Sequence, residues 1–177
     1  DAFDSVAPTY DGPQGNNDLI QRMRDITWAR IESLLPAGER LLIDLGCGTG
    51  QFSALIAPYV SRVIAVDASA EMLAAARTRL SALPTVEVRR GTLESLPVDD
   101  AQLDIAVLAL VLHHVPDPGR AIAEAARVVA PGGRVLIVDM LPHDRSDYQQ
   151  QMGHVWLGFA EPQIRRWLDS AGFGDAR

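Results

Sequence analysis

The chain has 177 residues, of which 47% are apolar, and this suits one domain with a single hydrophobic core. Its formal net charge of −7 argues against nucleic acid as a partner of this domain, and the absence of any lysine excludes a lysine base, a Schiff base and a phosphate-binding P-loop. The single cysteine, Cys47, cannot form an internal disulfide, and the longest uncharged apolar run is far shorter than the roughly 20 residues that span a bilayer, so we expect a cytoplasmic domain with no membrane partner.

The first 36 residues are predicted to form a polar arm followed by one amphipathic helix, because apolar side chains recur every three or four residues between Ile20 and Leu34. The chain then alternates between strand-like and helical stretches. The expected strands are 41–45, 62–66, 86–88, 105–109 and 134–138.

Capping residues place the helices between these strands. Ser69 can cap a helix over 70–83, and Asp117 followed by Pro118 can open a helix that runs through residue 129 and closes at Pro131-Gly132-Gly133. A last helix is expected over about 162–171. The alternation predicts an α/β fold with a doubly wound parallel sheet, whose ligand lies at the C-terminal ends of the strands.

The first expected strand ends in three glycines, Gly46, Gly48 and Gly50, which allow the backbone to turn sharply and to approach a ligand closely. Their spacing differs from the Gly-x-Gly-x-x-Gly of a dinucleotide-binding turn, which argues against an NAD-dependent oxidoreductase. Asp44 beside the turn would repel a pyrophosphate, whereas an ammonium, a hydroxyl or a sulfonium would be favourable there. The alternative is a tight turn in an ordinary α/β domain.

Residues 41–50 resemble motif I of the class I S-adenosylmethionine (SAM) dependent methyltransferases, and segments 63–67, 91–97, 104–115 and 127–139 resemble later motifs of that family in the same order. The resemblance implies a Rossmann-like class I methyltransferase fold, SAM as cofactor and S-adenosylhomocysteine as product. The full fold of this class has two further strands for which no segment is a candidate, so we expect the chain to lack the final strands.

The resemblance also implies roles for residues along the strand ends. Asp67 would accept the ribose hydroxyls, Met72 would pack on the adenine, Thr92 would replace the usual aspartate at the adenine amine, the Leu93 amide would serve an adenine ring nitrogen, and the backbone of Ala109 would hold the methionine amine. The predicted cofactor-binding residues are Tyr10, Asp44, Gly46, Cys47, Gly48, Thr49, Gly50, Asp67, Ala68, Met72, Thr92, Leu93 and Ala109.

Two features point to the methyl acceptor. Segment 3–11 resembles the opening of the quinone-biosynthesis-like branch of the family, where Tyr10 would close over cofactor and substrate; a surface aromatic in an arm is the alternative. His114 is the candidate general base for a hydroxyl or amine acceptor, since the ordinary pKa of histidine lies near neutrality, whereas a carbon or thiolate acceptor needs no base. The predicted residues around a small-molecule acceptor are His143, His154, Trp156 and Phe159.

The four histidines are expected on the acceptor side of the fourth and fifth strands. Their spacing along the chain matches no zinc pattern, so no metal is expected. Packing and surface roles are the alternatives to catalysis for each of them.

Segments 136–145 and 148–159 resemble methyltransferase domains that are fused to ArsR-type winged-helix repressors. This likeness gives the alternative function: a domain that senses SAM or S-adenosylhomocysteine for a fused or partner winged-helix DNA-binding domain. Such a winged helix would have to precede residue 1 or belong to a partner chain, and a homodimer is one option for the assembly. We divide the single domain into an N-terminal arm and helix (1–36), a cofactor-binding core (37–140), and an acceptor-side segment with the last helix (141–177).

Overall fold

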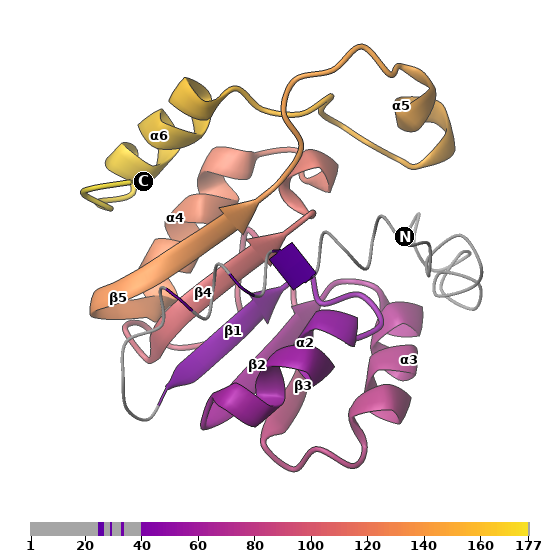
Figure 1. Ribbon diagram of the computed structural model, residues 1–177, viewed down its shortest axis with the longest axis vertical. Helices are drawn as coiled ribbons and strands as arrows, with labels where there is room; N and C mark the ends of the chain where they lie inside the picture. Colours follow the sequence, from indigo (N-terminus) through magenta and orange to yellow (C-terminus); the bar gives the residue numbers. More distant parts are fainter. Residues whose placement is uncertain (1–24, 27–28, 30–32, 34–39, 177) are drawn as a thin grey trace.

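The computed structural model describes residues 25–26, 29, 33 and 40–176. Five parallel strands form one sheet in the order β3-β2-β1-β4-β5 (Figure 1). They are β1 (Leu41–Leu45), β2 (Arg62–Asp67), β3 (Val86–Arg90), β4 (Leu103–Ala109) and β5 (Val129–Val138). The predicted doubly wound parallel sheet is confirmed, and the strand order reverses between β1 and β4, where such sheets bind ligands.

Helices follow the strands as the alternating sequence pattern predicts. They are α2 (Gln51–Ile56), the short 3-10 helix η2 (Ala57–Tyr59), α3 (Ala70–Leu80), the 3-10 helix η3 (Leu112–His114), α4 (Pro118–Val128), α5 (Asp147–Gln151) and α6 (Glu161–Ser170). None of the helices in the described part of the chain combines the length and the apolar character that a membrane crossing requires.

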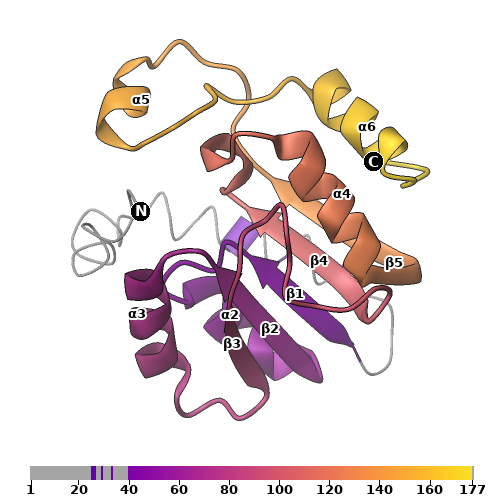
Figure 2. The same ribbon diagram turned by 180° about the vertical axis from the view of Figure 1, so that it is seen from behind.

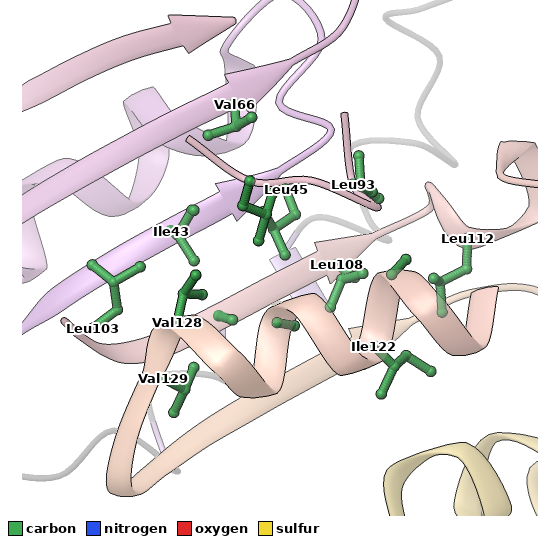
Figure 3. Packing of buried hydrophobic residues seen from close by; sticks show 14 of the residues in the cluster. Ile43, Leu45, Val66, Leu93, Leu103, Leu108, Leu112, Ile122, Val128 and Val129 are labelled. Atoms are coloured by element: carbon green, nitrogen blue, oxygen red, sulfur yellow. The ribbon is translucent and has the colours of Figure 1, made fainter. Parts of the chain in front are cut away.

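The core has two layers because successive side chains of a strand point to opposite faces of the sheet. On one face, Leu42, Val63 and Ile105 pack against Ile56 of α2. On the other face, the side chains of β1, β2 and β4 pack under α4, which Figure 2 shows in front of the sheet. The residues of this larger layer that Figure 3 labels are Ile43, Leu45, Val66, Leu93, Leu103, Leu108, Leu112, Ile122, Val128 and Val129.

Both predicted helix caps are confirmed. The Ser69 hydroxyl accepts a hydrogen bond from the Met72 amide at 3.1 Å, and the Asp117 carboxylate accepts one from the Arg120 amide at 3.0 Å. Helix α3 ends at Leu80 rather than at the predicted residue 83, because the chain turns there toward β3 and the Leu83 amide donates to the Leu80 carbonyl.

Strand β5 is longer than predicted. The Pro131-Gly132-Gly133 segment was expected to separate the helix from the strand, but pairing begins before it: Val129 pairs with Leu103, and Arg134 pairs with Ile105 after a shift in register. A side chain at Gly133 would lie 2.7 Å from the Asp104 carbonyl, so the glycine allows the irregular strand to stay close to β4.

Arg127, at the end of α4, forms hydrogen bonds to the loop that follows β3. Its guanidinium donates to Glu124 and Asp100 and to the carbonyls of Val98 and Leu96, with donor–acceptor distances of 2.6 to 3.2 Å. The hydrogen bonds to Glu124 and Asp100 raise the pKa of Arg127, since these carboxylates stabilise its charged form. The loop that carries Thr92 and Leu93 is therefore fixed to the helix beneath it.

The predicted N-terminal elements fall mainly outside the described residues. Tyr10 and segment 3–11 lie outside them. Of the predicted helix between Ile20 and Leu34, only Asp25, Ile26, Ala29 and Ser33 are described, and all four are helical.

Candidate functional site

The glycine turn after β1 lies at the reversal point of the sheet. Gly46, Gly48 and Gly50 all have positive φ angles, of 75°, 54° and 80°. The amides of Gly46 and Cys47 donate to the Val66 carbonyl at 2.8 and 2.9 Å, which attaches the turn to the end of β2. The left-handed backbone explains why glycines stand at these positions.

The three glycines face different surroundings. A Cβ atom at Gly46 would overlap the Val111 side chain, and one at Gly50 would lie 2.8 Å from Leu80 Cδ1. At Gly48, by contrast, no heavy atom of the described residues lies within 4 Å of where a Cβ atom would stand. Gly48 is therefore the glycine of this turn that faces open space, and its backbone is the part that a ligand can approach.

Asp67, at the end of β2, connects the glycine turn to the next loop. One carboxylate oxygen accepts a hydrogen bond from the Gly48 amide at 2.8 Å, and the other accepts one from the Ser69 amide at 2.9 Å. Each carboxylate oxygen has a second lone pair, so this arrangement still allows Asp67 to accept two hydroxyl groups of a ribose. The predicted role of Asp67 is compatible with its position.

Asp44 is buried within the sheet and accepts a hydrogen bond from the Ser53 hydroxyl at 2.5 Å. Burial raises the pKa of Asp44 to about 6; the Ser53 hydrogen bond opposes this shift and the charge of Asp67 adds to it. Ser53 on α2 was not identified from the sequence, although a hydroxyl one helical turn after the glycines is a signal that could have been used. A cation bound near this carboxyl would favour its ionised form.

Several predicted cofactor residues have side chains that pack inward. Cys47 lies among Ala65 and Leu73, and burial raises the pKa of its thiol. Leu93 belongs to the main core, and the side chains of Thr49 and Met72 are buried. Cys47 and Leu93 can thus meet a ligand chiefly through their backbone, as was expected for Leu93.

Thr92 is exposed, and its carbonyl accepts a hydrogen bond from the Ser95 amide at 3.2 Å. Ala68 is half-buried between Asp67 and the cap residue Ser69, and Ala109 is half-buried at the last position of β4. Ala68, Thr92 and Ala109 stand at the carboxyl ends of β2, β3 and β4, on the same edge of the sheet.

The loop after β4 is held by Asp139, a residue that sequence reasoning missed. Its carboxylate accepts a hydrogen bond from the Leu112 amide at 3.0 Å and one from the Met140 amide at 2.8 Å, and it lies 2.7 Å from Nδ1 of His113. The His113 and Asp139 side chains are only 5% and 4% exposed. Asp139 ends the apolar run of β5, and an acid at a strand end is the signal that could have marked it.

His154 lies beside His113 and His114 although it is far away in sequence. The amides of Val155 and Trp156 donate to the His113 carbonyl at 2.8 and 3.1 Å, which brings the His154 segment onto η3. The ring centroids are 4.1 Å apart for His113 and His114, 4.3 Å for His113 and His154, and 5.0 Å for His114 and His154. We call these three residues the histidine cluster.

Burial lowers the pKa of His114 to about 4, and the nearby His113 adds to the effect. Burial also lowers the pKa of His154. His114 is therefore neutral near pH 7, with Nδ1 lying 3.3 Å from the Gly153 carbonyl. The expectation of a base with a pKa near neutrality needs correction: His114 can accept a proton, but it is a weaker base than an exposed histidine.

The predicted acceptor residues separate into two groups. Trp156 donates from Nε1 to the Val115 carbonyl at 2.9 Å and packs with Phe159 and Trp167 at centroid distances of 5.7 and 6.4 Å. Phe159 also lines a hollow of about 800 Å³ that runs along β5 and α6. His143 and His154 flank Tyr148 instead, at centroid distances of 5.5 and 5.2 Å. Trp156 and Phe159 thus pack against the main core, whereas His154 lies against the loop that follows β4.

Comparison with known proteins matches the sequence of this chain to one family. A family profile described as "Methyltransferase domain" matches residues 43–137. An uncharacterized methyltransferase of Mycobacterium tuberculosis is 39% identical over 125 residues, which cover 71% of this chain and 50% of the relative. A protein of Clavibacter sepedonicus named demethylmenaquinone methyltransferase is 36% identical over 140 residues, which cover 77% of this chain and 56% of the relative.

One solved structure has a similar fold. The YcgJ protein of Bacillus subtilis aligns with a TM-score of 0.74 and 26% identity, covering 82% of this chain and 66% of that protein. The chain spans about half the length of the curated relatives described above.

Proposed function

We propose that this chain, which belongs to the methyltransferase domain family, binds SAM and transfers its methyl group to a small-molecule acceptor. The observation that carries the proposal is the open space at Gly48, bordered by the Asp67 carboxylate at the reversal point of the sheet. A glycine turn of this spacing beside two acids suits a neutral or cationic ligand with ribose hydroxyls better than a pyrophosphate.

For methyl transfer the protein mainly has to align the acceptor with the methyl group of SAM. The acceptor atom attacks the methyl carbon in line, the carbon–sulfur bond breaks with its electron pair on sulfur, and S-adenosylhomocysteine leaves. Holding the two reactants in this geometry is worth on the order of 7 to 11 kcal/mol. Where the acceptor is a hydroxyl or amine, its proton must also be removed.

We assign the removal of that proton to His114, which is neutral near pH 7 and stands at the end of β4. Because its pKa is lowered to about 4, His114 is suited to an acidic hydroxyl rather than to an alkyl alcohol. A quinone-type acceptor, the class in the name of the Clavibacter relative, fits this requirement in its reduced form and also fits direct attack from carbon, which needs no base.

Calorimetry tests the cofactor assignment. We expect SAM and S-adenosylhomocysteine to bind with micromolar-scale affinity, and NAD not to bind. Asp67→Ala should weaken SAM binding by about 1 to 3 kcal/mol, because the ribose hydroxyls lose a charged acceptor. The matched control is Glu71→Ala, which removes an exposed acid from the first turn of α3. Tight binding of NAD without binding of SAM would contradict the proposal.

A methylation assay with labelled SAM and a panel of acceptors then tests the reaction. Label should pass to a small molecule in the presence of the wild-type chain, and a quinone or hydroquinone should be among the acceptors. Binding of SAM without transfer to any acceptor class would instead favour the sensor function.

A further inference from the structure

The histidine cluster has the composition and the proximity of a metal centre. His113, His114 and His154 each offer one ligand atom, and these atoms all lie within 4.8 Å of one another. A tetrahedral ion with nitrogen ligands at about 2.0 to 2.1 Å holds them about 3.3 Å apart, so the three rings need to close up by only about 1.5 Å. Side-chain rotation can supply such a movement.

The polar atoms of the cluster are arranged as metal ligands require. Nδ1 of His113 faces a carboxylate and Nδ1 of His114 faces the Gly153 carbonyl, and these oxygens only accept hydrogen bonds. Both Nδ1 atoms therefore carry the ring proton, which leaves a lone pair on Nε2 of each ring. A hydrogen bond from the second ring nitrogen to a carboxylate or a carbonyl is the usual support of a histidine that binds a metal.

His154 provides an independent observation. It is 6% exposed, and its Nδ1 atom is buried without a hydrogen-bond partner within the described part of the chain. A buried nitrogen without a hydrogen-bond partner costs free energy of folding, so its presence needs an explanation. A metal ion between the three rings would give the Nδ1 atom of His154 a partner that the packing of the described residues does not provide.

We propose that His113, His114 and His154 form a binding site for one divalent transition-metal ion, with Zn²⁺ as the best fit, and that Asp139 positions His113 within it. Three imidazole ligands suit Zn²⁺, whereas Mg²⁺ and Ca²⁺ require oxygen ligands. A site with three protein ligands keeps at least one coordination position for water or another oxygen ligand.

From the sequence alone no metal is expected, because the histidine spacing matches no zinc pattern. That expectation considers spacing only, whereas the third histidine reaches the other two through main-chain hydrogen bonds between residues 155–156 and His113, not through a short loop or one helix face. Spacing along the chain cannot reveal a site that is assembled in this way.

The metal would have a consequence for the reaction, and this consequence alone rests on the proposed function. His114 would then hold the ion instead of acting as the base, and the ion would supply a Lewis acid that favours loss of the acceptor's proton to water.

The test uses the 177-residue chain without a polyhistidine tag, freed of metal with a chelator and then desalted. Titration with ZnCl₂ in a calorimeter should give one ion per chain, and CoCl₂ should give the intense visible absorption of a tetrahedral site. MgCl₂ should bind neither at this site nor in competition with Zn²⁺. Absence of stoichiometric Zn²⁺ binding by the wild-type chain would overturn the proposal.

Three variants locate the ion. His154→Ala should weaken Zn²⁺ binding by more than the factor of about 10 to 100 that is typical of losing an outer-shell partner, and Asp139→Asn should lose about 10- to 100-fold. His143→Ala is the matched control, because His143 lies beside Tyr148 but outside the histidine cluster, and its Zn²⁺ affinity should equal that of the wild type. Equal loss in His143→Ala and His154→Ala would place the ion elsewhere and refute the site.

Should His154→Ala fail to fold, as judged by circular dichroism, His114→Ala replaces it, because His114 is only partly buried. Calorimetry with SAM on the same samples separates this proposal from the proposed function. Binding of SAM without Zn²⁺ refutes the metal site alone, whereas binding of Zn²⁺ without SAM refutes the proposed function alone.

Discussion

Gly46 and Gly48 stand two residues apart in the same turn, yet replacing each by alanine should have different effects. Both residues have a positive φ, so each alanine variant should lose about 1 to 2 kcal/mol of folding free energy to the left-handed backbone. The new methyl group at Gly46 also overlaps the Val111 side chain, and such overpacking costs about 1 to 3 kcal/mol more. At Gly48 the methyl group enters open space.

Urea unfolding of the chain without SAM measures this difference. Gly46→Ala should be less stable than the wild type by about 2 to 5 kcal/mol, and Gly48→Ala by only about 1 to 2 kcal/mol. A double variant supplies the control: in a Val111→Ala background the overlap is relieved, so the cost of Gly46→Ala should fall toward that of Gly48→Ala.

For SAM affinity the order is reversed: the substitution at Gly48 should weaken binding more than the substitution at Gly46. The Gly48→Ala methyl group stands where we place the cofactor, so its affinity for SAM should fall at least about tenfold, or 1.4 kcal/mol. A Gly48→Val variant, with its β-branched side chain, should abolish binding. Wild-type affinity in Gly48→Ala, or equal losses of stability in both alanine variants, would refute the assignment of the open space to the cofactor.

The other predictions concern Asp44, Arg127 and Trp156. The pKa of Asp44 is about 6 in the folded chain against an ordinary value of 3.8, so its protonated form stabilises the fold at low pH, and this contribution of about 3 kcal/mol is lost as the pH rises from 4 to above 6. Asp44→Asn should remove that difference in urea unfolding at pH 4 and pH 7.5, and an unchanged pH dependence would contradict the raised pKa. Arg127→Met should lower the free energy of unfolding by about 1 to 3 kcal/mol, because buried carbonyls and Glu124 lose their donor, whereas Arg166→Met on the exposed side of α6 should change it by less than about 0.5 kcal/mol. Trp156→Ala should lower methyl transfer while SAM affinity stays nearly unchanged, and it should also destabilise the fold by about 3 kcal/mol; a change in SAM affinity equal to the change in turnover would argue against a role on the acceptor side.

The cofactor half of the site follows from the sequence because each of its parts is local. An apolar run that stops at glycines places Gly48 at a strand end, and the next strand ends at Asp67 by the same pattern. Parallel pairing of β1 with β2 then brings these ends together without further information. The hydrogen bond between Asp67 and the Gly48 amide is a direct result of that pairing.

The differences among the glycines could not be predicted, because they depend on contacts from distant segments. Val111, which fills the space next to Gly46, comes from the loop after β4, and Leu80, next to Gly50, comes from the end of α3. The same holds for the pKa of His114. The pKa of His114 is lowered because a segment 39 residues further along the chain helps to bury the ring. The residue type alone therefore predicts a pKa that is too high.

The segment that we propose for the acceptor side, residues 140–160, has little regular structure, and main-chain hydrogen bonds determine its course. The His143 amide donates to the Leu157 carbonyl at 3.1 Å, the Phe159 amide donates to the Met140 carbonyl at 2.8 Å, and the Val155 amide donates to the His113 carbonyl at 2.8 Å. Such bonds do not depend on which side chains the segment carries, whereas the histidine cluster requires a histidine at residue 154 in addition to His113 and His114. The same backbone course can therefore carry a different side chain at residue 154 without a change in the fold.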